Sequence, residues 1–175
     1  IDFEILSNAL NTVSATAIAS TTTSAHAATG DVKASATKTT SASDIGGPTA
    51  RVQGASNGTY YLLYGASGAS PNTHEVYEFP GVRLVASRTS TGAAAGDKWT
   101  LTVEGSGATI TLKIYKNDVQ VGTNISDTDA ARITGAGQTG MYSDSGSGKY
   151  DDFLVEDFAA GGGATYPGAD GCGVW

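Results

Sequence analysis

The chain has 175 residues and a formal net charge of −7, with 24 glycines and only 15% charged residues. A negative chain is repelled by nucleic acid phosphates and by anionic lipid, so neither is an expected partner. No stretch approaches the roughly 20 apolar residues of a membrane span, so membrane insertion is not expected, and the single cysteine, Cys172, excludes an internal disulfide.

Short strands are predicted along the chain, because apolar and polar residues alternate and the segments end at Gly, Asn, Asp or Ser. No apolar stripe at helical spacing separates them. The early strands are expected at 3–5, 12–19, 31–39, 50–53, 59–64, 75–79 and 82–87. Alternation puts Tyr60 and Tyr64 on one strand face and Tyr61 on the other.

The clearest strand pair is 99–103 with 110–115, joined by a turn that contains glycine. Each strand has one apolar face, made by Trp99, Leu101 and Val103 and by Ile110, Leu112 and Ile114. A hairpin at 115–121 follows, and the last strands are expected at 140–143 and 150–158. About ten short strands without helices predict an all-β fold, a two-sheet antiparallel β-sandwich of jelly-roll type.

One β-sandwich domain is predicted over residues 1–158, followed by a glycine-rich linker and tail at 159–175. Since position 1 is Ile1, the chain is expected to be processed or to be a piece of something longer. Aromatic side chains often anchor interfaces, so Tyr166 and Trp175 in the tail are candidate partner contacts. The alternative is a disordered tail.

From about Tyr60 onward the order of features resembles the concanavalin A-like, laminin-G-like jelly-roll domains. The resemblance is carried by 96–103, 111–122, 133–140 and the segment Tyr-Asp-Asp-Phe at 150–153. Asp118 stands where that pattern usually has Gly, and Tyr150 where it often has Phe. The resemblance implies concanavalin A-like topology, and it implies a family strand upstream of 3–5 that is missing here, so an edge is open or completed by another polypeptide.

Members of that group include sugar-binding modules, glycoside hydrolases and non-catalytic parts of secreted or phage-encoded surface proteins, so fold does not decide activity. Hydrolysis needs two carboxyl groups about 5–5.5 Å or about 6.5–9.5 Å apart. Asp152 and Glu156 lie roughly 13 Å apart on one strand face, and Glu75 and Glu78 face opposite ways. The family's E-x-D-x-x-E run is missing, so the chain is predicted not to be an enzyme.

Calcium is the one candidate cofactor, because it takes hard oxygen ligands from acidic loops. Asp144 and Asp151 stand at the two ends of the Gly/Ser loop 145–149 and are the predicted ligands. Asn117-Asp118 or Asp127-Thr-Asp129 could add to them from other loops. The alternative is that these loops bind only water.

A carbohydrate site needs aromatic faces beside polar side chains that bind sugar hydroxyls. The middle of the chain supplies both: Tyr60, Tyr64 and Tyr77, with Asn72, His74 and Glu75 nearby. The alternative is that these tyrosines only pack in the core.

The favoured function is a non-catalytic structural or adhesive surface module of a larger extracellular or virion assembly, with other protein subunits as partners. A carbohydrate-binding, lectin-like module is the first alternative, and a diverged glycoside hydrolase is the second. The extracellular or virion-surface location rests on the resemblance alone.

Overall fold

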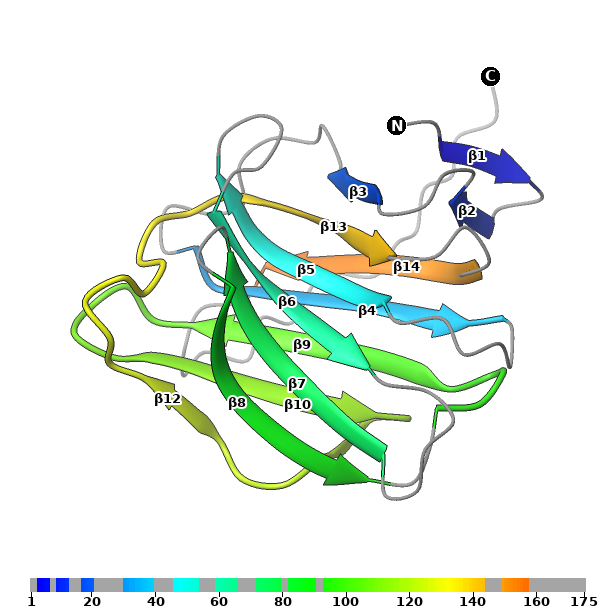
Figure 1. The fold of residues 1–175 in the computed structure, drawn as a ribbon. Coiled ribbons are helices and arrows are strands. Elements are labelled where there is room, and N and C mark those ends of the chain that lie inside the picture. The colour runs from blue at the N-terminus through cyan, green and yellow to red at the C-terminus, as the bar shows by residue number, and fades with distance from the viewer. Residues whose placement is uncertain are drawn as a thin grey trace, which may run out of the picture.

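The computed structural model describes residues 3–6, 9–12, 17–20, 30–39, 46–53, 59–65, 72–79, 82–90, 93–143 and 149–157. Every regular element in these ranges is a strand, and the strands form two antiparallel sheets (Figure 1). The all-β, two-sheet antiparallel sandwich of jelly-roll type predicted from the sequence is confirmed. Among the described residues there is no helix long and apolar enough to span a bilayer.

One sheet has eight strands in the order β1-β2-β14-β4-β9-β10-β11, with β12 also paired to β10. Their bounds are β1 (Phe3–Leu6), β2 (Ala9–Thr12), β4 (Val32–Lys38), β9 (Lys98–Glu104), β10 (Ile110–Lys116), β11 (Val119–Gln120), β12 (Ile125–Asp127) and β14 (Lys149–Asp157). The pairing of β9 with β10 is the one expected from the sequence.

The other sheet has six strands in the order β3-β13-β5-β6-β7-β8. Their bounds are β3 (Ala17–Ser20), β5 (Gly46–Gln53), β6 (Thr59–Gly65), β7 (Asn72–Phe79), β8 (Arg83–Ser90) and β13 (Gln138–Ser143). In Figure 1, β5 to β8 form the layer in front of β4, β9 and β10. The sandwich therefore has two outer faces, one on each sheet.

Some predicted bounds are wrong. The single strand expected at 12–19 is replaced by β2 and β3, which belong to different sheets. Strand β5 begins at Gly46 rather than at 50, although Gly46-Gly47-Pro48 is typical of a turn, because it pairs with β13 on one side and β6 on the other. Strand β12 was not predicted, since three residues are too few for a visible alternation.

The main core lies between the two sheets and is built from alternate strand positions. The apolar core side chains on β9 and β10 are Trp99, Leu101, Val103, Ile110, Leu112 and Ile114, as predicted. Tyr61 and Leu63 of β6 meet them from the other sheet. Full burial of such a side chain contributes about 1.5–3 kcal/mol. The positions between these residues must face outwards.

A smaller cluster lies on the outer face of the six-stranded sheet. Tyr60 and Leu62 are buried there, and Tyr64 packs beside them, while Tyr61 belongs to the main core. The predicted division of the tyrosines between the two faces is confirmed.

The closing strand β14 contains a bulge, where the register shifts between Asp151 and Leu154 and Asp152 has a φ of 51°. Phe153 and Val155 pack against core clusters on the inner side, and Asp152 is exposed. This arrangement confirms the inward and outward positions predicted for Phe153, Val155 and Asp152.

Candidate functional site

A polar groove of about 370 Å³ crosses the outer face of the eight-stranded sheet. It is lined by Lys33 of β4, Thr100, Thr102 and Glu104 of β9, Lys113 and Tyr115 of β10, and Asp118 in the turn after β10. These are the positions that alternate with the core residues of the same strands, so three adjacent strands build one continuous polar surface. Its volume is in the range of about 300–1,000 Å³ found for ligand sites.

One row across the groove places Thr102 between two lysines. Lys33 lies opposite Thr102 on β9, and Thr102 lies opposite Lys113 on β10. The Lys33 ammonium is 2.7 Å from the Glu156 carboxylate, and the Lys113 ammonium is 2.6 Å from Glu104 Oε1. That last hydrogen bond raises the pKa of Lys113. Both lysines therefore stand as oriented hydrogen-bond donors on the walls of the groove.

The next row contains two hydroxyls and an aromatic ring. Ser35 lies opposite Thr100, and Thr100 lies opposite Tyr115, which is half-buried. Ser35 and Thr100 are each 1% exposed. Neither hydroxyl has a hydrogen-bond partner within the described part of the chain. Tyr115 therefore lies next to Thr100, whose buried hydroxyl makes no hydrogen bond to any described residue.

The hairpin turn between β10 and β11 closes one end of the groove. Asn117 and Asp118 have φ angles of 50° and 64°, which is the backbone pattern of a type I′ turn and confirms the predicted hairpin. The Asn117 amide donates to Asp97 Oδ1 at 2.9 Å, and the Asp118 carboxylate lies 3.0 Å from Lys98 Nζ. The turn thereby places the Asp118 carboxylate, a hydrogen-bond acceptor, at this end of the groove.

The tyrosines predicted to bind sugar lie on the opposite side of the sandwich. Tyr60 is only 4% exposed, while Tyr64 and Tyr77 are half-buried. The Tyr64 ring meets Tyr77 edge-to-face with centroids 5.6 Å apart, and it lies 6.4 Å from the ring of Tyr142. The structure thus brings Tyr64 and Tyr77 together and adds Tyr142, which the sequence did not point to.

The three polar residues predicted beside those tyrosines all belong to β7. In the strand register Glu75 is opposite Tyr64, His74 is opposite Gly65, and Asn72 is opposite Ser90 of β8. Their side chains lie outside the described part of the structure. Sugar contact by this group stays a prediction.

Three of the four residues predicted to bind calcium or to contact a partner lie outside the described residues; these are Asp144, Tyr166 and Trp175. Asp151 is half-buried, and its Oδ1 accepts the backbone N–H of Asp152 at 2.8 Å. In the ranges that the structure covers, no group of three or more His, Cys, Asp or Glu side chains could hold a metal ion. Calcium binding and partner contact by the tail remain predictions.

A buried charge network occupies the edge of the main core. Arg83 donates to Glu78 at 2.8 Å and to both carboxylate oxygens of Asp127 at 3.1 and 2.7 Å. Burial alone would raise the pKa of Asp127, but hydrogen bonds from Arg83, Tyr61 and the Asp129 N–H outweigh it, and the net pKa lies below the ordinary value. Because this carboxylate stays ionised and paired, it serves as an anchor between sheets rather than as a proton donor.

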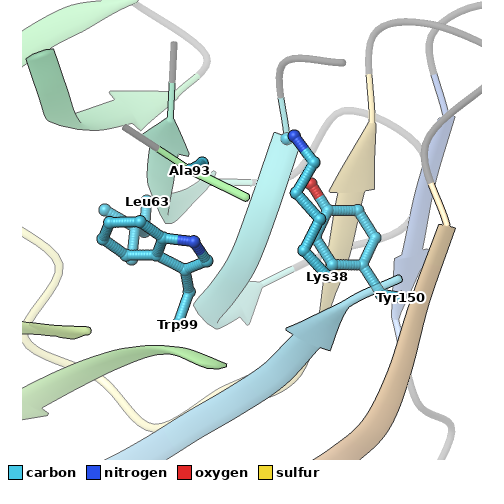
Figure 2. Close-up of a pocket in the computed structure, with 6 residues that line it drawn as sticks. Lys38, Leu63, Ala93, Trp99 and Tyr150 are labelled. Atoms are coloured by element: carbon cyan, nitrogen blue, oxygen red, sulfur yellow. The ribbon is translucent and has the colours of Figure 1, made fainter. Parts of the chain in front are cut away.

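A second cavity, between the sheets, is far smaller. It has a volume of about 10 Å³ and is lined by Lys38, Gly46, Leu63, Ala93, Trp99 and Tyr150. Figure 2 shows the long Lys38 side chain beside the Tyr150 ring, with Trp99 and Leu63 at the other side of the cavity. A single water needs about 10–15 Å³ of such space. This cavity cannot admit a sugar, so of these two cavities, both lined by described residues, the outer groove is the one with room for such a ligand.

Apart from Asp118, which was a possible additional calcium ligand, the groove residues were not predicted as a site from the sequence. The signal was present, because Thr100, Thr102, Lys113 and Tyr115 are the alternate positions of the two most clearly predicted strands. What the sequence does not show is that Lys33 of β4 lies beside β9 on the same face.

The fold is similar to that of a solved sugar-binding protein. The carbohydrate-binding module CBM66 from Bacillus subtilis superimposes with a TM-score of 0.52 at 19% sequence identity, covering 86% of this chain and 96% of that one. No family model matches the chain, and no curated protein matches its sequence. At this identity the likeness supports the jelly-roll fold and not a shared site.

Proposed function

We propose that this chain is a non-catalytic carbohydrate-binding module and that it binds sugar in the groove across β4, β9 and β10. The observation that carries the proposal is the composition of the groove, whose lining combines Tyr115 with threonines and with lysine and carboxylate side chains, among them the ion pair Lys113–Glu104. Such a site offers an aromatic surface together with donors and acceptors, which is what a sugar with its C–H faces and hydroxyls requires.

The groove is built mainly on strands. Its lining side chains other than that of Asp118, which is in the turn after β10, project from three strands in continuous antiparallel register. The ion pairs Lys33–Glu156 and Lys113–Glu104 place the two ammonium groups 2.7 and 2.6 Å from their carboxylates. Preorganised side chains lose little conformational entropy when a ligand binds, which favours affinity for a weakly binding ligand such as a sugar.

The charges near the core support binding without hydrolysis. Glu78 and Asp127, the two carboxylates that Arg83 bridges, are both buried and are both held by that guanidinium. In the groove, Glu104 and Asp118 are each paired with a lysine. None of these carboxylates is left as a free acid and base flanking an open site, as glycoside hydrolysis requires.

A glycan array followed by calorimetry on the best ligand tests the proposal. Tyr115→Ala should weaken binding about tenfold, equivalent to about 1.4 kcal/mol. Tyr64→Ala is the matched control, because it removes a half-buried tyrosine from the other outer face. Thermal melts of both variants check that they fold. Loss of binding in Tyr64→Ala alone would move the site to the six-stranded sheet, and absence of glycan binding by the wild type would overturn the proposal.

A second candidate is a role in protein assembly, favoured by the edge of the six-stranded sheet. Among the described strands β8 pairs only with β7 on that side, and it presents Leu84, 49% exposed, next to Val82, 58% exposed. An open edge with apolar side chains can accept a strand from a second chain. Light scattering tests this role: Leu84→Lys should dissociate an assembly of the wild type, and a wild type that is monomeric at high concentration would contradict it. An extracellular or virion setting for such an assembly is proposed from the sequence resemblance.

A further inference from the structure

We infer that the ion pair between Lys113 and Glu104 is the specificity-determining contact of the groove, and that it binds two adjacent hydroxyl groups of one sugar ring, one on each side chain. This inference rests on the proposed function and names the ligand class of the same site, a sugar that carries a free vicinal diol.

The Lys113–Glu104 pair is open to the groove. Both residues line it, and their side chains are 22% and 16% exposed. They come from adjacent strands, Lys113 from β10 and Glu104 from β9. A ligand in the groove can therefore touch both members of the pair.

The pair keeps unused hydrogen-bonding capacity. An ammonium has three donors, and that of Lys113 gives one to Glu104 Oε1 at 2.6 Å. The Thr102 hydroxyl donates to the same oxygen at 3.4 Å. No described residue donates to Glu104 Oε2, and none accepts a second hydrogen bond from Lys113. The hydrogen bond to Glu104 raises the pKa of Lys113, so this donor stays charged at neutral pH.

A donor beside an acceptor matches two adjacent hydroxyl groups. One sugar hydroxyl can accept from the Lys113 ammonium while its neighbour donates to the Glu104 carboxylate, since a hydroxyl can do either. Hydrogen bonds to a charged group are roughly twice as strong as those between neutral groups, so this pair discriminates more than the threonines of the groove do. An anionic group only accepts, and it would meet the Glu104 charge at close range. The pair therefore favours a diol over a carboxylate or a sulfate.

Tyr115 is placed to hold the ring of the same sugar. It is two residues from Lys113 on β10, and both residues line the groove. At a rise of about 3.3 Å per residue the two positions are about 6.6 Å apart. A ring that packs on Tyr115 therefore places hydroxyls at its edge beside Lys113, and the pair distinguishes sugars by those hydroxyls.

Lys113→Met and Glu104→Met test the pair, because methionine keeps an unbranched side chain and removes the charged group. Calorimetry on the best glycan from the array should show that each variant binds about tenfold more weakly than wild type, and thermal melts check that the variants fold. Unchanged affinity in either variant would overturn the inference.

The matched control is Lys116→Met. Lys116 is on the same strand, lies 2.9 Å from Asp97 and is 15% exposed, but it does not line the groove. Lys116→Met removes the same charge as Lys113→Met and should leave affinity within about twofold of wild type at physiological salt. An equal fall in both lysine variants would show that binding depends on net charge rather than on the pair, and the inference would fail.

Deoxy versions of the same glycan separate direct contact from a structural role. Removing either of two adjacent hydroxyls should weaken binding to wild type about tenfold. One of these deoxy sugars should bind Lys113→Met as well as the parent sugar does, and the other should do so with Glu104→Met, because the removed hydroxyl has already lost its partner.

Two results of the deoxy series would overturn the inference. One is a wild type for which no two adjacent hydroxyls matter, and the other is a series in which the effects of deoxygenation and substitution add for every hydroxyl. The proposed function survives either result if Tyr115→Ala still weakens binding. Absence of any glycan binding by the wild type would instead refute the proposed function.

Discussion

The hydroxyl of Tyr61 donates a hydrogen bond of 2.7 Å to Asp127 Oδ2 and accepts one of 3.0 Å from the backbone N–H of Ile133. Tyr61 is on β6 of the six-stranded sheet, and Asp127 is on β12 of the eight-stranded sheet. Arg83 of β8 forms an ion pair with the same carboxylate. Asp127 therefore connects β12 of the eight-stranded sheet to two strands of the six-stranded sheet, β6 and β8. The sandwich is thus closed by polar contacts as well as by its apolar core.

Asp127→Asn should lower the free energy of unfolding by about 2–4 kcal/mol, because it removes the negative charge that Arg83 and Tyr61 both face in a buried site. Urea denaturation measures the change. The control is Asp118→Asn, whose carboxylate is exposed and paired only with Lys98; it should stay within about 0.5 kcal/mol of wild type. Equal effects of the two substitutions would contradict a special role for Asp127.

Acid should abolish the contribution of Asp127 to the free energy of unfolding. The folded-state pKa of Asp127 is lower than the ordinary value, so the unfolded chain binds the proton first as pH falls. The stabilisation is complete above the unfolded pKa of about 4 and is lost as pH drops through the lower folded value. Urea titrations of wild type and Asp127→Asn should therefore differ by a constant amount near neutral pH and converge below about pH 4. A gap that stays constant down to pH 2 would be inconsistent with this linkage.

Alkali should destabilise the protein through its buried tyrosines. Burial raises the pKa of Tyr60 to about 12, with a smaller contribution from the nearby Tyr142. The folded state then holds the phenol proton more tightly than the unfolded state, so stability present below about pH 10 declines as pH rises towards 12. Tyr60→Phe removes this titration, and its stability should fall less steeply than that of wild type. Denaturation curves from pH 9 to 11.5 make the comparison; parallel slopes would refute it.

Arg51 should be one of the least replaceable residues. Its side chain is fully buried, and its guanidinium donates to the carbonyls of Gly30 at 2.9 Å, of Ile133 at 2.6 Å and of Gly105. A lysine cannot reproduce this fork of donors, so Arg51→Lys should cost about 3 kcal/mol or more. Chemical denaturation measures this loss in the free energy of unfolding.

Arg132→Lys is the matched control for Arg51→Lys. Arg132 also binds backbone carbonyls, those of Gly107 and Asp129, but it does so at the exposed surface. Water can replace its contacts, and the change should stay below about 1 kcal/mol. If the control were as destabilising as Arg51→Lys, burial would not explain the sensitivity of Arg51.

Added calcium tests the predicted pair Asp144 and Asp151. Binding to the folded state alone raises the melting temperature, so calcium should raise it, EDTA should reverse the rise, and Asp151→Asn should remove it. Asp152→Asn is the control, since Asp152 is exposed at the neighbouring position of the same strand. A melting temperature that calcium and EDTA leave unchanged would end this prediction.

The sequence predicted more of the fold than of the site. The faces of β9 and β10 follow from local alternation, and so does the division of Tyr60 and Tyr64 from Tyr61. It was harder to predict from the sequence which of the two outer faces carries the candidate binding site. The tyrosines were the visible candidates, yet Tyr60 is buried in a small cluster, while the groove on the other sheet is built from threonines and lysines that are ordinary on any outward strand face.

By itself, the sequence determined that the chain is all-β, which residues of β9 and β10 face inwards, and that these two groove strands carry polar outer positions, because a strand alternates its faces every residue and this period is local. Only the tertiary structure decided that Lys33, Thr102 and Lys113 form one row, and that Arg83 bridges Glu78 and Asp127. Strand order and register join segments distant in the chain, and they are settled by packing of the whole sandwich rather than by any local pattern.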